Sequence, residues 1–432
     1  MEKKNDLEYK LDDPEEEVIQ NKFSGKNNTN KNKIIISAII ISIVIIIGII
    51  IIIFVWIKPS KKKKDTKISE YYIYKNIPTA ENKTIINSFK SDGENYNPIL
   101  GNINNGNDYE ETDRNNFDIC IPYNITKRKN KYNRIFLYIH GGGWTGGEKM
   151  DVEHLCKSYE KYGFISASMS YTLFNGTYKE ANMFRIIDEI TSTIKGIKIF
   201  LKKEGFNDNK LEMIIAGGSS EGHLSMLYSY MIKNPAISIK FIYDNVGPVT
   251  LEPKYFLSTK IYNDSLENIE PEDIDKAKEN DNLISMNSDP NALMKNFGLI
   301  SSMNLAIGRK FNDNFDEIFS DLEKGEVNEN SEKYIELLNK AKYAFPVTYV
   351  DNKSIPTICV YGGQDEYDGV ANYAVLKKAF VNHNNENNIT LVYYKYGHHD
   401  VYSPVCEDQK NAIIKENKVF LEHIQKYLTQ DN

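Results

Sequence analysis

Apolar and polar positions divide the chain into three parts. Residues 1–33 are charged and poor in aromatic side chains, residues 34–57 are an unbroken apolar run, and the rest alternates short apolar runs with longer helical patterns. That alternation is typical of βαβ units in a mostly parallel sheet. The tail cannot bury enough apolar area to order itself, so we expect it to be disordered. A juxtamembrane stalk is predicted over 58–94 and an α/β domain over 95–430.

Within the last part, short apolar runs rich in β-branched residues mark the predicted strands. They cover 117–121, 135–139, 164–169, 211–216 and 241–246, and further runs begin at Ile355 and Thr390. Helices are predicted over 184–203 and 220–231. Between about residues 250 and 350 the strand rhythm stops, and charged stretches over 317–324 and 332–344 have a helical pattern. The pattern therefore predicts a doubly wound, mostly parallel sheet that is interrupted by a helical insertion.

The run over 34–57 is long enough to cross a membrane. Its 24 uncharged residues make a helix of roughly 36 Å, against a hydrocarbon core of about 30 Å. A cleaved signal peptide is the main alternative, but the run is too long, follows a long polar segment and ends without a small-residue cleavage pattern. We expect a single transmembrane helix.

Two features of the sequence give opposite answers for the side of the membrane. Lysines are denser after the run than before it, six against four within fifteen residues, which favours a cytoplasmic catalytic domain. Six Asn-X-Ser/Thr sequons follow the run, and a secretory compartment would use them as glycosylation acceptors. The sequence leaves the side open, and our working prediction is luminal or extracellular.

Composition excludes several functions. Net charge is −7 with both signs mixed along the chain, so the basic stripe of a nucleic-acid-binding protein is missing. The four cysteines have neither CxxC spacing nor a nearby histidine pair, and we predict no metal and no organic cofactor. Two disulfides are possible in an extracytoplasmic domain, but we expect structural thiols, since Cys359 falls in a strand expected to be buried.

Two glycine-containing motifs each follow a predicted strand directly. The first is His140-Gly141-Gly142-Gly143-Trp144, where missing Cβ atoms let backbone N–H groups turn toward a substrate oxygen. The second runs from Gly217 to His223 and turns from a strand into a helix through two serines. These contexts predict an oxyanion hole and a nucleophile elbow.

A carboxylate and a histidine follow in the order that this chemistry needs. Asp365 comes after the apolar run that begins at Ile355, and His398-His399 comes after the run that begins at Thr390. A serine hydroxyl becomes nucleophilic when a histidine removes its proton, and a carboxylate fixes the tautomer of that histidine. Ser, Asp and His at the carboxyl ends of successive parallel strands would form such a set.

Together these motifs resemble the α/β-hydrolase fold superfamily. The HGGGW motif, the Gly-His-Leu after the serines and the Tyr-Gly-x-x-Asp segment are similar to its esterase and lipase branch, which includes carboxylesterases and kynurenine-formamidase-like enzymes. The resemblance covers roughly residues 95–428. It implies that the insertion over about 250–350 is a cap over the active site, and that Gly142, Gly143 and the residue after the nucleophile, Ser220, form the oxyanion hole.

Two adjacent serines compete for the nucleophile. Strict GxSxG spacing selects Ser220, between Gly218 and Gly222. Alignment with the resembled family selects Ser219, which lies four residues before His223, and this is our prediction. That alignment puts Glu221 where the family has its second glycine, so we expect the glutamate to point away or to distort the turn.

The base and the acid also have neighbours that compete with them. We predict His398 as the base, because the family places it directly after a glycine, and His399 as a solvent-facing neighbour. Asp365 is predicted as the acid because its spacing from Tyr361-Gly362 matches the family's, whereas Glu366 and Asp368 are interpreted as loop charges.

Three functions remain open on these residues. The first is a membrane-anchored serine hydrolase that cleaves a small-molecule carboxylic ester through an acyl-enzyme intermediate. The second is a peptidase, which is disfavoured because the sequence has no peptide-selecting module. The third is a catalytically weak or dead adhesion or scaffold domain, which Glu221 favours and the intact acid and base oppose.

Overall fold

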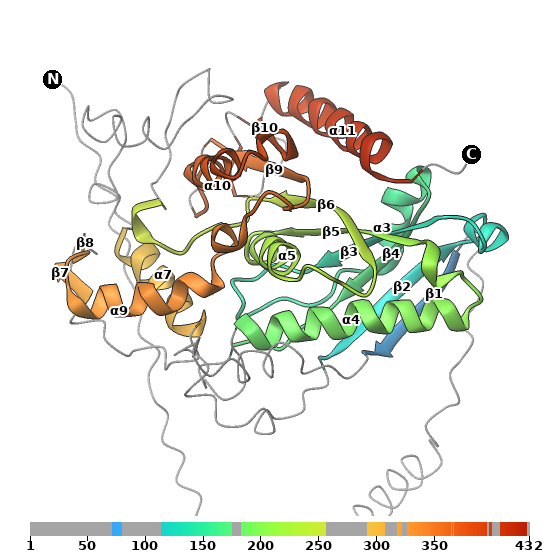
Figure 1. The fold of residues 1–432 in the computed structure, drawn as a ribbon, viewed down its shortest axis with the longest axis horizontal. Coiled ribbons are helices and arrows are strands. Elements are labelled where there is room, and N and C mark those ends of the chain that lie inside the picture. Colours follow the sequence, from blue (N-terminus) through green and yellow to red (C-terminus); the bar gives the residue numbers. More distant parts are fainter. Residues whose placement is uncertain are drawn as a thin grey trace, which may run out of the picture. The chain divides into compact units, whose positions relative to one another are not determined.

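The computed structural model describes most of the chain after residue 70. The described residues are 71–79, 114–174, 183–255, 292–306, 318–321, 326–363, 365, 367–394, 397–399 and 407–429 (Figure 1). All the described residues fall in one compact unit, residues 65–432. The tail predicted over 1–33 and the membrane helix predicted over 34–57 lie outside the described residues. In the ranges given above, no helix is long and apolar enough to cross a membrane.

An eight-stranded sheet organises the domain. Its spatial order is β1 (Tyr71–Pro78), β2 (Asn116–Pro122), β4 (Phe164–Met169), β3 (Asn133–Ile139), β5 (Leu211–Gly218), β6 (Ser238–Asn245), β9 (Thr357–Gly362) and β10 (Ile389–Tyr394). The pairs β1–β2 and β2–β4 are antiparallel, and all the others are parallel. Strands β4 and β9 are buried along their whole length, as expected for a sheet covered on both faces. The prediction of a mostly parallel α/β sheet is confirmed.

Helices follow most of the parallel strands. They are α3 (Val152–Tyr159), α4 (Met183–Lys203), α5 (Ser220–Met231), α7 (Ala292–Ala306), α9 (Glu332–Ala341), α10 (Ala371–Asn382) and α11 (Glu407–Tyr427). The helix predicted over 184–203 is α4, and the helix predicted over 220–231 is α5. Helix α5 packs on β5 and β6. The turn from β5 into α5 is therefore held against the centre of the sheet.

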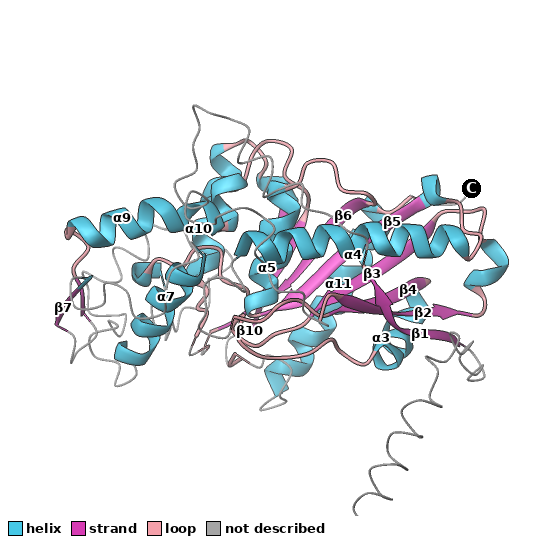
Figure 2. Ribbon diagram, turned by 90° about the horizontal axis from the view of Figure 1, so that it is seen from below, coloured by secondary structure: helices cyan, strands magenta, loops and turns pink. Residues whose placement is uncertain are grey.

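Both faces of the sheet carry helices (Figure 2). On one face, Phe420 of α11 and Tyr159 of α3 have ring centroids 5.9 Å apart, and both contact Phe136 of β3. Strand β2 shows the division between the faces, since Cys120 packs toward α3 whereas Ile119 and Ile121 belong to the main core. Alternate side chains of a strand point to opposite faces, so this strand is buried on both sides.

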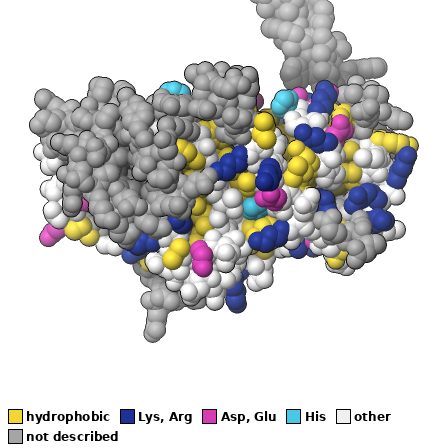
Figure 3. All heavy atoms as spheres, turned by 90° about the horizontal axis from the view of Figure 1, so that it is seen from above, with side chains coloured by type: hydrophobic (Ala, Val, Ile, Leu, Met, Phe, Trp, Pro, Cys, Tyr) yellow, Lys and Arg dark blue, Asp and Glu magenta, His cyan; other side chains and the backbone are white. Residues whose placement is uncertain are grey.

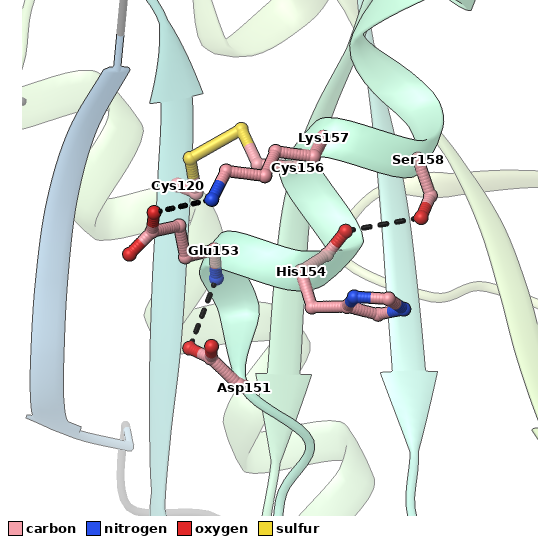
Figure 4. The surroundings of a disulfide bond; sticks show 7 residues. All are labelled: Cys120, Asp151, Glu153, His154, Cys156, Lys157 and Ser158. Atoms are coloured by element: carbon pink, nitrogen blue, oxygen red, sulfur yellow. Dashed lines mark hydrogen bonds and ion pairs between the residues drawn. A yellow bond between two sulfur atoms is a disulfide. The ribbon is translucent and has the colours of Figure 1, made fainter. Parts of the chain in front are cut away.

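A disulfide joins the β2 strand to α3. Cys120 and Cys156 are bonded, with their Cα atoms 6.0 Å apart and a sequence separation of 36 (Figure 4). The expectation of structural thiols is therefore wrong for this pair, because the fold brings together two cysteines that no spacing motif connects. Cys359 is a buried free thiol in β9, as expected.

Two other expectations about the chain's organisation need correction. The stalk predicted over 58–94 contains β1, whose Tyr71 and Ile73 are buried against α3, so the sheet begins before residue 95. The helical stretch predicted over 317–324 contains the short strand β7 (Phe319–Asp321), which pairs with β8 (Glu326–Val327). The stretch predicted over 332–344 forms α9, followed by the 3-10 turn η8 (Lys342–Ala344).

Charged side chains of both signs are interspersed with apolar ones on the face drawn in Figure 3. The same mixture runs along the sequence, whose net charge of −7 comes from 53 basic and 60 acidic residues.

Candidate active site

Four loops meet at one edge of the sheet. They follow β3, β5, β9 and β10, which are all parallel to one another. Because the carboxyl ends of parallel strands share an edge, residues far apart in sequence come together there. These loops carry the glycine triplet, Ser219, Asp365 and His399. The loops that carry the sequence motifs therefore lie at this edge of the sheet.

Ser219 occupies the tip of the turn between β5 and α5. Its φ is 58° and its ψ is −126°, a backbone conformation that is costly for a residue with a Cβ atom. The turn is held from both sides, because the N–H of Ser219 donates to the carbonyl of Asn245 at 2.8 Å and its own carbonyl accepts from the N–H of His223 at 3.2 Å. The hydroxyl is thereby fixed above the sheet edge.

Two glycines permit this close turn. A Cβ atom on Gly217 would lie 2.4 Å from Cβ of Glu221, and one on Gly222 would lie 2.1 Å from Oδ1 of Asp244. Either contact would push α5 away from the sheet. Gly222 therefore supplies the close approach of helix to strand that the family pattern assigns to a glycine one position earlier.

Asp365, His399 and Ser219 form a continuous hydrogen-bonded chain. Nε2 of His399 lies 3.0 Å from Oγ of Ser219, and Nδ1 lies 3.0 and 3.1 Å from the two carboxylate oxygens of Asp365. Asp365 is only 2% exposed, and its Oδ1 also accepts the backbone N–H groups of Tyr367 and Asp368 at 2.8 and 2.9 Å. These donors fix the carboxylate so that it faces the imidazole.

The histidine in this chain is His399, whereas the sequence prediction was His398. The turn after β10 explains the difference. Gly397 is packed so tightly on β9 that a Cβ atom on Gly362 would lie 2.3 Å from the carbonyl oxygen of Gly397 and 2.8 Å from that of His398. The backbone of His398 therefore crosses the end of β9, and the next residue is the one whose ring reaches between Ser219 and Asp365.

The competing serine points elsewhere. Ser220 is 1% exposed, and its hydroxyl lies 3.5 Å from Oε1 of Glu221. It is the first residue of α5, and its side chain is under the turn rather than at its tip. The geometry therefore separates the two serines, with Ser219 alone bonded to a histidine.

Asp368 lies close to this chain but is not part of it. Its Oδ2 is 3.9 Å from Nδ1 of His399, beyond hydrogen-bonding distance. Burial, together with the neighbouring charge of Asp365, raises the pKa of Asp368 well above its usual range, while His399 opposes that shift. Asp368 is thus a buried carboxyl group rather than the loop charge that we expected.

The glycine triplet after β3 forms a tight loop. Gly142 has a φ of 132° and Gly143 a φ of 59°, and a Cβ atom on Gly142 would lie 2.4 Å from the carbonyl oxygen of Gly146. The carbonyl of Gly142 accepts the N–H groups of Thr145 and Gly146 at 3.1 and 2.9 Å. Among the hydrogen bonds of the described residues, none has the N–H of Gly142 or Gly143 as its donor.

The sequence suggested that Glu221 would point away or distort the turn. The structure shows neither. Its side chain is fully buried beneath the glycine loop. The place of Glu221 in the motif does not predict this burial, because the side chain contacts Gly141, eighty residues earlier in the sequence.

His223 serves the fold rather than the chemistry. Burial lowers its pKa to about 4, so the ring is neutral, and Nε2 donates to the carbonyl oxygen of Ala344 at 2.8 Å. This bond ties α5 to the turn η8. Within the described ranges, no cluster of histidine, cysteine and carboxylate side chains could hold a metal ion.

A mostly parallel sheet whose carboxyl edge carries the turn between β5 and α5 is the arrangement of the α/β-hydrolase fold. The chain belongs to the BD-FAE family, whose sequence model matches residues 117–380, more than half of the chain. No curated protein matches it.

Many solved structures have a similar fold at low sequence identity. A truncated carbohydrate esterase from gut microbiota is 14% identical, with a TM-score of 0.45, over 73% of this chain and 93% of that one. Inhibited esterase B from Lactobacillus rhamnosis is 13% identical, with a TM-score of 0.43, over 74% and 86%. Thermogutta terrifontis esterase 2 phosphoramylated by tabun is 11% identical, with a TM-score of 0.44, over 74% and 95%.

Proposed function

We propose that this chain is a serine hydrolase that cleaves a carboxylic ester through an acyl-enzyme intermediate on Ser219. The observation that carries the proposal is the hydrogen-bonded chain from Asp365 through His399 to Ser219. An imidazole held by a buried carboxylate on one nitrogen and by a hydroxyl on the other has the geometry of a general base beside its nucleophile.

The reaction has two halves. Nε2 of His399 takes the proton of Ser219 as Oγ bonds to the ester carbonyl carbon, and the alcohol then leaves with that proton as the ester C–O bond breaks. Water next attacks the acyl-serine, giving its proton to His399, which returns it to Ser219 as the acid is released. Asp365 stays ionised throughout and stabilises the imidazolium.

The oxyanion hole proposed for this reaction consists of the N–H groups of Gly142, Gly143 and Ser220. Positive φ values at the two glycines and the uncommitted donors of the loop support it. Such preorganised donors stabilise the negative charge of the tetrahedral intermediate, and loss of one costs on the order of 10²-fold or more in rate.

A cap between β6 and β9 is proposed to select the substrate. The described parts of this insertion are α7, the β7–β8 hairpin and α9, and α7 contacts both α9 and α4. Helix α7 has buried apolar side chains, including Ile300 and Met303. The proposed substrate is a small-molecule ester whose acyl group the cap would accommodate.

We also propose that residues 34–57 anchor the enzyme and that the hydrolase domain lies on the luminal or extracellular side. The Cys120–Cys156 disulfide supports this side, since disulfides persist in oxidising compartments. Two sequon asparagines, Asn124 and Asn352, are exposed.

The membrane-bound protein should resist alkaline carbonate extraction and shift in mass on glycosidase treatment. Carbonate release would contradict the anchor. Protease digestion of the domain in cells whose plasma membrane alone is permeabilised with digitonin, but not in intact cells, would contradict the side.

The direct test of the chemistry uses the full-length protein in detergent. Wild type should hydrolyse a short-chain p-nitrophenyl ester. Ser220→Ala, which keeps the backbone N–H at this position, should retain folding and most of this turnover. Ser219→Ala should lose turnover by about 10³-fold or more. A folded wild type without turnover would reject the hydrolase and favour the scaffold alternative.

A further inference from the structure

Glu221 lies under the proposed oxyanion loop. It is the second residue of α5, and its side chain has no exposed surface. A Cβ atom on Gly141 would lie 3.0 Å from Oε2 and 3.2 Å from Oε1 of Glu221. The carboxyl group therefore packs against the backbone immediately before Gly142, and it limits how far the loop can sink toward the sheet.

The carboxyl group belongs to a buried polar cluster that joins three elements. Oε1 lies 4.0 Å from Nδ1 of His140 and 3.5 Å from Oγ of Ser220. Oε2 has no hydrogen-bond partner among the described residues. The ring of His140 stacks on Tyr171 at 4.4 Å with an interplanar angle of 7°, and the hydroxyl of Tyr171 donates to the carbonyl of His140 at 3.4 Å. The cluster thus connects the end of β3, the end of β4 and the start of α5.

Burial favours the uncharged forms of the side chains in this cluster. It raises the pKa of Glu221 well above its usual range, although the hydroxyl of Ser220 and backbone groups of Gly218 and Glu221 oppose the shift. Burial also lowers the pKa of His140 and raises that of Tyr171. Both shifts disfavour an ion pair between Glu221 and His140.

Charged side chains around the cluster also shift the pKa values of its members. Arg114 binds the carbonyls of Tyr171 and Gly147 at 2.9 and 2.6 Å, and its charge opposes protonation of His140. Glu148 acts on His140 in the opposite sense. Glu189 raises the pKa of Tyr171 slightly, but it is paired with Arg185 at 3.1 Å.

We propose that Glu221 is a positioning residue, whose neutral carboxyl group supports the loop of Gly141, Gly142 and Gly143 and whose ionisation at alkaline pH switches catalysis off. This inference rests on the proposed hydrolase function. A negative charge buried beside the oxyanion hole would repel the charge that develops on the substrate oxygen, in an environment where water screens it poorly. Glu221, which stands where the family has a glycine, then contributes to catalysis by positioning the loop.

The test is the pH dependence of kcat for the full-length protein in detergent, with a short-chain p-nitrophenyl ester. Wild-type kcat should fall on the alkaline side as Glu221 loses its proton. Glu221→Gln, which is isosteric and cannot ionise, should keep most of the neutral-pH kcat and lack the alkaline fall. Glu221→Ala should lower kcat about tenfold or more with little change in KM, because the support is needed in the transition state.

Glu416→Gln is the matched control. Glu416 is a buried carboxyl group on α11, and burial raises its pKa to about 8, so its variant should retain the alkaline fall of wild type. An alkaline fall shared by wild type and Glu221→Gln, or a folded Glu221→Ala with unchanged kcat, would overturn the inference alone. A folded wild type without turnover at any pH would overturn the hydrolase proposal and this inference with it.

Discussion

Nε2 of His399 lies 3.0 Å from Oγ of Ser219, although the two residues are 180 positions apart in the chain. Neither residue has a regular backbone environment. Ser219 is held at a positive φ by the turn into α5, and His399 follows a turn that crosses the end of β9. The two side chains meet because the loops after β5 and β10 lie at the same edge of the sheet.

The first prediction separates the two adjacent histidines. His399→Ala should lower kcat on the order of 10³-fold or more, because no other described imidazole reaches the hydroxyl of Ser219. His398→Ala should stay within about threefold of wild type, and steady-state kinetics with a short-chain ester will measure both. Greater loss in His398→Ala than in His399→Ala would refute the assignment.

A second prediction distinguishes the two buried aspartates beside His399. Asp365→Asn should reduce kcat by about 10³- to 10⁴-fold, because an amide at this position favours the wrong imidazole tautomer. Asp368→Asn keeps the backbone N–H that donates to Asp365, so its kcat should remain within about tenfold of wild type. Equal losses in the two variants, with both folded, would show that the carboxyl groups act as a pair.

The disulfide should contribute to stability. Replacing both Cys120 and Cys156 with Ala should lower the free energy of unfolding by about 2–4 kcal/mol, because the cross-link restricts the unfolded chain. Denaturant titration measures this difference. A reducing agent should lower the Tm of wild type and leave that of the double variant unchanged, whereas equal responses would mean that the bond does not form.

Burial of Glu416 gives stability a pH dependence. Burial raises its pKa from 4.5 to about 8, so the folded state binds more protons than the unfolded state between these values. The free energy of unfolding should therefore decrease as pH rises through this window. Glu416→Gln removes this contribution and can still accept the hydrogen bond from Tyr394. Urea titrations should give a smaller decrease for the variant, and an identical or steeper decrease would contradict the burial argument.

Local sequence was enough to predict the sheet and the turn that carries Ser219. Buried parallel strands are continuous apolar runs, and glycines at Gly217 and Gly222 mark a place where strand and helix come close. Strand β1 was missed because its alternating Tyr71 and Ile73 stand within a polar, lysine-rich neighbourhood. It pairs with residues of β2 that lie 38 to 51 positions later in the chain.

Contacts between distant segments account for the other differences. The choice between His398 and His399 depends on how Gly397 packs against Gly362, and nothing in the two histidines' own neighbourhood decides it. Glu221 is buried because Gly141 leaves room for its carboxyl group. Spacing alone could not pair Cys120 with Cys156, because the pairing requires α3 to lie on β2.

Covalent labelling tests the central claim most directly. The full-length protein in detergent should react with a fluorophosphonate probe, and mass spectrometry of the digested adduct should place the phosphonyl group on Ser219. Ester hydrolysis should disappear in proportion to labelling, and Ser219→Ala should not react whereas Ser220→Ala should. An adduct on Ser220 or elsewhere, or a folded wild-type protein that neither reacts nor hydrolyses esters, would contradict the account.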